Sequence, residues 1–245
     1  MTTLINIRQR LWVNTIPLFA LLFFIALVST AQTAYAQKIA TLEAVKGDVR
    51  VFKPGKTRGL KGRNGMALFE KSIIKTTNDD SFADVVYNKG GKVRVMPQSE
   101  LVLASADFSK GKMRAKIDLI AGKIFNVVDK LAEGDSYEVK TQTSTSGVKG
   151  TIFSAETTAQ ESVFMVKEGS VEAINLAGVQ KAVLVNSMTK TVIAAGKAPT
   201  DPVPLTPEEI AMFDILDDLF EQEKADIMED TMEAVKEDII EGMMP

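Results

Sequence analysis

From Lys38 to about Val192, hydrophobic and polar positions alternate with a period of two, in short runs separated by turn residues. Such alternation is typical of β-strands with one face on a core. The clearest runs are Asp48–Val51, Ala83–Tyr87, Lys92–Val95 and Tyr137–Lys140. Asn88–Gly91 separates two of them and predicts a hairpin, because glycine takes the positive φ that such turns need. The pattern predicts a nearly all-β body.

A different pattern begins at residue 200. Residues 200–207 are rich in proline and predict a stiff, extended linker. Thr206 to Glu209 has the features of a helix start, with threonine as the N-cap and a glutamate three residues later. Beyond it, large apolar residues recur mostly every three or four positions among many acids. We expect residues 208–245 to form an acidic, amphipathic α-helical tail.

The first 36 residues predict an export signal. Arg8 and Arg10 precede the apolar run Ile16–Val28, and the small residues Ala34 and Ala36 mark a cleavage site. The run is shorter than the ~20 residues of a membrane-spanning helix. We therefore expect cleavage after Ala36, no membrane span in the mature chain, and a periplasmic or extracellular location; an uncleaved anchor is the alternative. The predicted organisation is a signal peptide (1–36), a β domain (37–199), a proline-rich linker (200–207) and the tail (208–245).

Cysteine and histidine are both absent from the chain. The lack of cysteine excludes disulfides, a thiolate nucleophile and a cysteine zinc site. The lack of histidine removes the commonest general base and metal ligand. The acidic tail also lacks the D-x-[DN]-x-[DN]-G spacing of a calcium loop. We expect a protein that is not an enzyme and that needs no cofactor or metal.

Charge is divided unevenly along the chain. Residues 208–245 hold 14 acidic residues and two lysines, whereas residues 37–207 carry a net charge of +7. Opposite charges attract within the screening length of about 8 Å at physiological ionic strength. We expect either that the tail docks on a body, in the same chain or in another copy, or that it is a solvated helix that aids solubility.

Three glycines share one setting, in which the chain turns into a strand that begins with β-branched residues. They are Gly47, Gly122 and Gly169. Their spacing is too irregular for a strict repeat but is compatible with an elaborated solenoid whose strands begin at similar bends. The alternative is that glycine commonly opens strands in any β protein.

The segment Ser146–Phe153, SGVKGTIF, contains a G-x-x-G with Lys149 inside it and Thr151 after it. A nucleic-acid-clamping G-x-x-G joins two helices, and a phosphate-binding loop places its lysine after the last glycine. This segment lies between strand-like runs, so neither pattern fits. A serine nucleophile in residues 140–146 with Lys149 nearby is a third interpretation, but no second base is marked. We interpret Gly147 and Gly150 as a structural bend between strands.

Five basic residues interleaved with glycines form a candidate contact for an anionic partner. They are Lys53, Lys56, Arg58, Lys61 and Arg63. An anionic cell-wall polymer or the acidic tail would fit them, and a solvated loop is the alternative. The single tryptophan, Trp12, lies in the predicted signal and tyrosines are few, so stacking platforms for sugars or single-stranded nucleic acids are not evident. We expect no nucleic-acid partner.

Several motifs in a fixed order resemble the FecR domain over about residues 40–195. They are Gly47–Val51, Leu68–Thr76, Val93–Leu101, Leu119–Ile124, Tyr137–Thr141, Ser146–Phe153 and Val166–Val171. Val148, Lys149, Gly150 and Thr151 stand where the family has VRGT, with lysine in place of the usual arginine. The resemblance implies an extracytoplasmic, all-β, solenoid-like module in which these residues, Gly147, Gly122 and Gly169 are structural.

The best-known members of this family are membrane-bound regulators that relay a receptor's signal to a cytoplasmic sigma factor. About 15 residues precede the apolar segment here, so we expect this chain to lack the cytoplasmic sigma-binding region. Our first hypothesis is a non-enzymatic sensory or regulatory module that binds an envelope protein through exposed β edges or the helical tail. Two alternatives remain: a binder of peptidoglycan or surface polysaccharide, and a FecR-like regulator of sigma-factor signalling. The sequence leaves the oligomeric state open.

Overall fold

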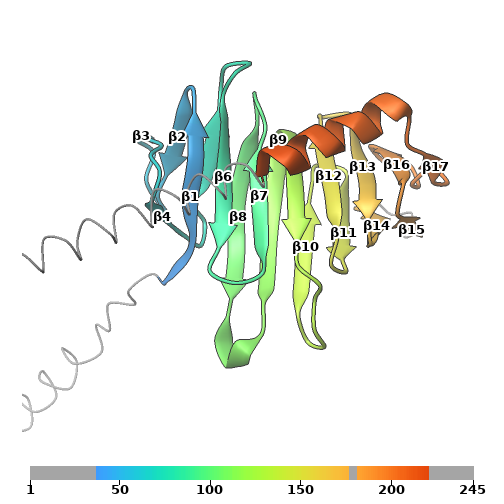
Figure 1. The fold of residues 1–245 in the computed structure, drawn as a ribbon, viewed down its shortest axis with the longest axis horizontal. Helices are drawn as coiled ribbons and strands as arrows, with labels where there is room; N and C mark the ends of the chain where they lie inside the picture. The colour runs from blue at the N-terminus through green and yellow to red at the C-terminus, as the bar shows by residue number, and fades with distance from the viewer. Residues whose placement is uncertain (1–36, 177–180, 221–245) are drawn as a thin grey trace, which may run out of the picture. The chain divides into compact units, whose positions relative to one another are not determined.

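The computed structural model describes residues 37–176 and 181–220, which fall in one compact unit that covers residues 37–245. Seventeen strands form the body, and residues 207–220 form a helix that lies across it (Figure 1). The prediction of an all-β body followed by a C-terminal helix is confirmed. The predicted signal peptide and the tail beyond residue 220 lie outside the described residues. Within the described ranges, no helix is long and apolar enough to cross a membrane.

Nine strands form a first sheet, sheet A, in which all neighbours are antiparallel. In spatial order they are β4 (Met66–Phe69), β1 (Lys38–Lys46), β6 (Phe82–Tyr87), β7 (Gly91–Val95), the second part of β9 (Arg114–Val128), β12 (Ile152–Thr157), β13 (Glu161–Glu168), β16 (Thr189–Ala194) and β17 (Val203–Pro204). The predicted hairpin at 88–91 joins β6 to β7, and Gly90 has a φ of 70°.

The other strands form sheet B together with the first part of β9. In spatial order they are β3 (Leu60–Lys61), β2 (Val49–Phe52), β5 (Ile73–Thr76), β8 (Glu100–Asp107), β9, β10 (Ser136–Lys140), β11 (Ser144–Val148), β14 (Ser170–Asn175) and β15 (Ala182–Asn186). A short 3-10 turn, η1 (Ser109–Gly111), lies between β8 and β9. Neighbours are antiparallel except β9 and β10, which are parallel.

The hydrophobic core lies between the two sheets. Sheet A contributes buried residues such as Val85 and Ile124, and sheet B contributes residues such as Ile74, Leu101 and Val139. Each strand alternates core-facing residues with outward-facing ones, as the period of two in the sequence predicts. The solenoid-like part of the prediction stays a prediction, since the strands are arranged as two sheets joined through β9.

The segment before the helix is attached to the body. The Thr200 N–H donates to the Val192 carbonyl, β17 pairs with β16, and the buried Leu205 donates its N–H to Met188. The helix then begins with the predicted reciprocal cap. The Thr206 N–H donates to Oε2 of Glu209 at 2.8 Å, and the Glu209 N–H donates to Oγ1 of Thr206 at 3.3 Å. Residues 200–207 therefore fix where the helix starts and are not a free spacer.

Candidate functional site

The segment Val148 to Thr151 connects β11 to β12. Val148 is in the core and Lys149 is exposed. Gly150 has a φ of 59°, and a Cβ at this position would lie 2.7 Å from the Cα of Lys130, so only glycine fits without a shift. Gly147 differs from this, because it lies inside β11 without a positive φ, and a Cβ there would meet nothing within 4 Å. The bend is therefore at Gly150, and the expectation for Gly147 was wrong.

The connection after β13 packs against this bend. Gly169 has a φ of 80°, and a Cβ there would lie 2.3 Å from the carbonyl oxygen of Gly150. Thr151 is buried, its backbone exchanges hydrogen bonds with Val128 at 3.0 and 2.9 Å, and its Oγ1 has no partner among the described residues. These residues fit each other closely around the bend.

A second kind of bend uses a glycine and a serine from a neighbouring turn. Gly47 and Gly122 have φ values of 70° and 84°, and a Cβ would lie within 2.4 Å of the Oγ of Ser81 or Ser99. Each serine oxygen accepts the N–H of the residue after the glycine, at 2.9 Å in both cases. The first bend takes the chain from β1 to β2, and the second takes β9 from sheet B to sheet A, so both change sheets.

The buried hydroxyls of the hydroxyl-rich run belong to a hydrogen-bonded network. Oγ1 of Thr141 lies 2.7 Å from Oγ of Ser144 and accepts a hydrogen bond from Ser162 at 2.8 Å. Thr143 donates to Ser162 at 2.7 Å. These hydroxyls satisfy one another between the sheets, whereas Lys149 is exposed. Over the described ranges, no group of three or more acidic side chains is placed to hold a metal ion.

The five basic residues of the candidate anionic contact lie together between β2 and β4. All of Lys53, Lys56, Arg58, Lys61 and Arg63 are exposed. None forms a salt bridge with another residue of the described ranges. This basic loop is next to β3, at the end of sheet B, and the described helix lies over other strands (Figure 1).

The helix packs its apolar side on the outer face of sheet A. Phe213, Leu216 and Phe220 are buried in a cluster with Phe125 of β9 and Met165 of β13. The ring of Phe125 lies 5.3 Å from that of Phe213 and 5.4 Å from that of Phe220. Burying each of these side chains contributes roughly 1.5–3 kcal/mol. Apolar packing therefore contributes most of the free energy that holds the helix on sheet A.

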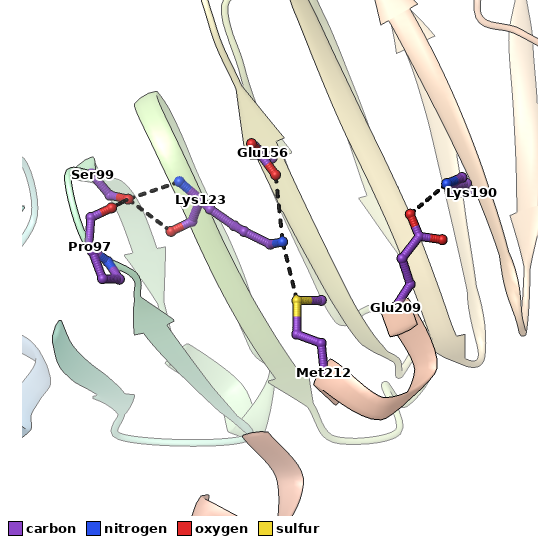
Figure 2. A network of polar contacts seen from close by, with 7 residues as sticks. All are labelled: Pro97, Ser99, Lys123, Glu156, Lys190, Glu209 and Met212. Atoms are coloured by element: carbon purple, nitrogen blue, oxygen red, sulfur yellow. Dashed lines mark hydrogen bonds and ion pairs between the residues drawn. The ribbon is translucent and has the colours of Figure 1, made fainter. Parts of the chain in front are cut away.

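Three lysines of sheet A contact the helix, and two of them pair with its acidic residues. Lys190 of β16 pairs with Glu209, and Lys123 of β9 lies 3.6 Å from Glu156 and 3.4 Å from the sulfur of Met212 (Figure 2). Lys167 of β13 lies 2.7 Å from Asp214. Such partly exposed pairs are worth about 0–1 kcal/mol each. They orient the helix more than they hold it.

Two of these contacts shift pKa values. The hydrogen bond to Asp214 raises the pKa of Lys167, and the charges of Asp214, Asp217 and Glu168 add to this effect. Burial alone would raise the pKa of the Glu209 carboxyl, but the hydrogen bonds from Lys190 and the Thr206 N–H outweigh it and lower the pKa. Both shifts stabilise the charged forms that the contact needs.

The end of the described helix covers a buried ion cluster. Asp84 is fully buried on the outer face of sheet A, where it pairs with Arg94 at 2.7 Å and with Lys92 at 2.8 Å. The ring of Phe220 lies 4.1 Å from Nζ of Lys92 and 4.4 Å from the guanidinium carbon of Arg94. A desolvated cation over an aromatic face is attracted by about 2 kcal/mol. Phe220 thus links the helix to this cluster.

The other side of the helix is both apolar and acidic. Ile215 is 61% exposed and Leu219, one turn later, is 39% exposed. Glu208 and Asp218 are exposed beside them and form no described ion pair, and residues 207–220 contain no basic residue. We call Glu208, Ile215, Asp218 and Leu219 the outward helix face. Exposed apolar residues rimmed by charge are typical of protein-binding surfaces.

The lysines under the helix were not predicted from the sequence to be contact residues. Lys123, Lys167 and Lys190 each occupy an outward position of a strand whose next outward neighbours are apolar, such as Phe125 and Met165. An apolar residue on the solvent side of a strand is a signal that something covers it. That signal is visible in the sequence only when the inward and outward faces are known.

Comparison with known proteins adds a family to this description. Residues 74–172 match the family model described as FecR protein. Two crystal structures of a protein from Parabacteroides distasonis, proposed to be an anti-sigma factor, are similar at 13% identity and a TM-score of 0.46. Each comparison covers 57% of this chain and 62% of the other chain, so the match spans less than two thirds of that protein. No curated protein matches the sequence.

The matched region contains most of the bends described above. It runs from within β5 to within β14 and includes Gly122, the connection through Gly150 and Thr151, and Gly169. The residues that carry the sequence resemblance are thus the ones that turn the chain between strands. Residues 74–172 of this chain therefore form a FecR-like region.

Proposed function

We propose that this protein is a non-enzymatic FecR-domain module that binds another protein in the cell envelope. The observation that carries the proposal is the outward helix face, in which Ile215 and Leu219 are exposed beside the acids Glu208 and Asp218. Sheet A holds this helix through its opposite side, so the outward face is presented on a rigid support. Exposed anchors on a preordered element bind at a low entropic cost.

We further propose that this binding serves a sensory or regulatory role. It is supported by the FecR match at residues 74–172, because FecR-like proteins act through protein partners. Relay of a signal toward a sigma factor is the corresponding alternative. In either case the partner is a protein, and the helix is the element that we assign to it.

Export to the periplasm or beyond belongs to the same proposal. It is supported by the basic, apolar and small-residue pattern of residues 1–36, with cleavage after Ala36. The mature protein would begin at Gln37 and would contain no tryptophan, since Trp12 is the only one. Mass spectrometry of the protein from its native envelope tests this point.

Capture from envelope extract tests the function. The intact protein should retain a discrete protein partner, and the double variant Ile215→Asp with Leu219→Asp should lose it because two anchors become charged. Leu60→Asp is the matched control, because Leu60 is an exposed leucine at the far end of sheet B. Equal capture by all three proteins would contradict an interface on the helix.

Binding of an anionic envelope polymer is the second candidate, and the basic loop favours it. Five exposed cations without described ion pairs lie between β2 and β4, one of them, Lys61, in β3 itself. Sedimentation with purified peptidoglycan or a purified acidic polysaccharide tests it. Salt-sensitive retention that is lost in a variant with Lys56, Arg58 and Lys61 changed to Gln, together with no captured protein, would support this candidate and overturn the first.

A further inference from the structure

The two sheets end in four edge strands that differ in how well they are protected. Edge strands present unpaired backbone groups, and natural proteins shield them with short strands, proline or charge. β3 and β17 have two residues each, and β17 contains Pro204. β4 has four residues, all buried or half-buried, and is followed by Glu70 and Lys71. These three edges have the usual protection.

The fourth edge strand, β15, is the longest of the four, and its charged neighbour Lys181 lies before the strand, where it pairs with Asp201. It has five residues, Ala182 to Asn186, without charge or proline. Val183 and Val185 face the core, and Leu184 points outward and is 53% exposed. Over the described ranges its ladder partner is β14 alone, through pairs such as Glu172 with Leu184. Among the residues that the structure describes, none pairs with the other side of β15, so its backbone groups there are open to an added strand.

The surface beside this edge is apolar as well. Leu176 directly follows β14 and is 45% exposed, and the half-buried Ile174 lies opposite Ala182. Of the eight exposed large hydrophobic residues in the described ranges, four lie at this end of the body, in or next to β14, β15 and β17. Figure 1 shows β15, β16 and β17 together at the end of the body away from β3 and β4.

An added strand must meet two requirements at this edge. It must be uncharged, since it would otherwise bury an unpaired charge, and it must alternate apolar residues on both faces. β15 is uncharged, and its central residues Val183-Leu184-Val185 are apolar on both faces and symmetric about Leu184. Antiparallel pairing of two such strands places Leu184 opposite Leu184 and Val183 opposite Val185. Cross-strand pairs of this kind stabilise a sheet, and the arrangement is two-fold symmetric, as in most homodimers.

We propose that two copies of this protein dimerise through antiparallel pairing of their β15 strands, which joins the two B sheets into one. The basic loop lies at the opposite end of sheet B, and the helix lies on sheet A, so both stay accessible. The dimer presents two outward helix faces on one rigid body, and two linked sites bind a clustered partner more tightly than one. The proposal does not rest on the proposed function.

Sedimentation velocity of the intact protein over a range of concentrations tests the dimer. The unmodified protein should sediment as a dimer that dissociates on dilution, and Leu184→Lys should weaken dimerisation at least tenfold, because it sets two lysines opposite each other. Leu60→Lys is the control for an exposed aliphatic residue at the other end of sheet B, and it should dimerise like the unmodified protein. A protein that is monomeric throughout, or a Leu184→Lys dimer of unchanged affinity, would overturn the proposal.

A charge-rescue experiment tests the register. Residue 184 faces its own copy across the two-fold axis, so Leu184→Lys and Leu184→Glu should each be monomeric alone. An equimolar mixture should form a heterodimer, because each lysine then meets a glutamate. A mixture that stays monomeric while both variants are folded by circular dichroism would show that position 184 does not face itself, and the proposed pairing would be wrong.

Discussion

Gly150 holds a backbone conformation and a close contact that a side chain cannot share. Its φ of 59° costs an L-residue about 1–2 kcal/mol, and the 2.7 Å approach to Lys130 adds a clash. Gly65 separates the two effects, since its φ is 78° but nothing lies within 4 Å of a Cβ. Gly147 has neither problem.

We predict that alanine at these three positions gives a graded loss of stability. Gly150→Ala should lower the free energy of unfolding by more than about 2 kcal/mol, Gly65→Ala by about 1 kcal/mol, and Gly147→Ala should be neutral or slightly stabilising. Denaturant titrations measure all three. If Gly150→Ala and Gly65→Ala lowered the free energy of unfolding equally, the clash with Lys130 would not contribute to the loss of stability at Gly150.

Two neighbouring tyrosines in the core differ in one hydrogen bond. The Tyr137 hydroxyl donates to Oδ1 of Asn126 at 3.0 Å, whereas the buried Tyr87 hydroxyl has no partner within the described ranges, and burial raises its pKa. The two rings lie 6.3 Å apart, and both side chains are buried in the same core.

We predict that phenylalanine has opposite effects at these two sites. Tyr137→Phe should cost about 1–3 kcal/mol, because it leaves the Asn126 carbonyl oxygen buried and unpaired, while Tyr87→Phe should be neutral or stabilising, because it removes an unpaired hydroxyl. Thermal unfolding of both variants checks this. Equal destabilisation would mean that the Tyr87 hydroxyl has a partner.

At the scale of single residues, the sequence predicted features that depend on the special backbone freedom of glycine. A glycine followed by a strand start predicted the bends at Gly47, Gly122 and Gly169, which all have positive φ. The prediction failed at Gly147, which lies inside a strand and has an ordinary backbone conformation. The sequence alone does not distinguish such a glycine from one at a bend. The serine that completes each sheet-changing bend comes from a distant turn and leaves no local signal.

At the scale of elements, the helix is held by apolar packing and positioned by charge. The chain has no cysteine, so a single introduced thiol reports on the helix. Leu216→Cys places the thiol on the buried side, and Ile215→Cys places it on the exposed side as a matched reference. The ratio of their labelling rates measures how often the helix leaves sheet A.

We predict that Phe213→Ala raises the relative labelling of Leu216→Cys far more than Lys167→Gln does. Loss of a buried phenylalanine costs about 3–5 kcal/mol, whereas loss of a partly exposed ion pair costs at most about 1 kcal/mol. The difference corresponds to at least tenfold in the labelling rate. Comparable effects of the two changes would mean that the contact is mainly electrostatic.

The helix contact should also weaken in acid. The pKa of Glu209 is lowered below its ordinary value of 4.5, so its contribution is complete above that pH and is lost as the pH falls through the folded-state pKa. We predict that labelling of Leu216→Cys, relative to Ile215→Cys, rises below about pH 4.5 with a thiol reagent that reacts in acid. Glu209→Gln should remove part of this rise, and a pH-independent ratio in the parent would contradict the assignment.

The elements themselves were largely predictable, but their partners were not. Period-two runs located β2, β6, β7 and β10, and the threonine-to-glutamate spacing located the helix start. The sequence gives no local sign that the single strand β9 serves both sheets, or that it pairs in parallel with β10. Docking of the helix through Phe213 and Phe220 likewise depends on which strand faces point outward.

For the whole molecule, the large difference in net charge between the body and the C-terminal segment contributes little to how the described helix is bound. The body is basic and the C-terminal segment is acidic, but the described helix meets lysines of sheet A and not the basic loop. The loop and the outward helix face are left as separate surfaces, one cationic and one acidic and apolar. Composition alone could not distinguish them, because their separation arises from the order of strands in the two sheets.

Site-specific photo-crosslinking in living cells tests the central claim most directly. A photoreactive residue at position 215 should capture a discrete envelope protein other than this chain, whereas one at position 60, on the opposite end of the body, should not. A protein with no crosslinked partner at position 215, retained instead on peptidoglycan through its basic loop, would contradict the claim that this protein acts by binding another protein through its helix.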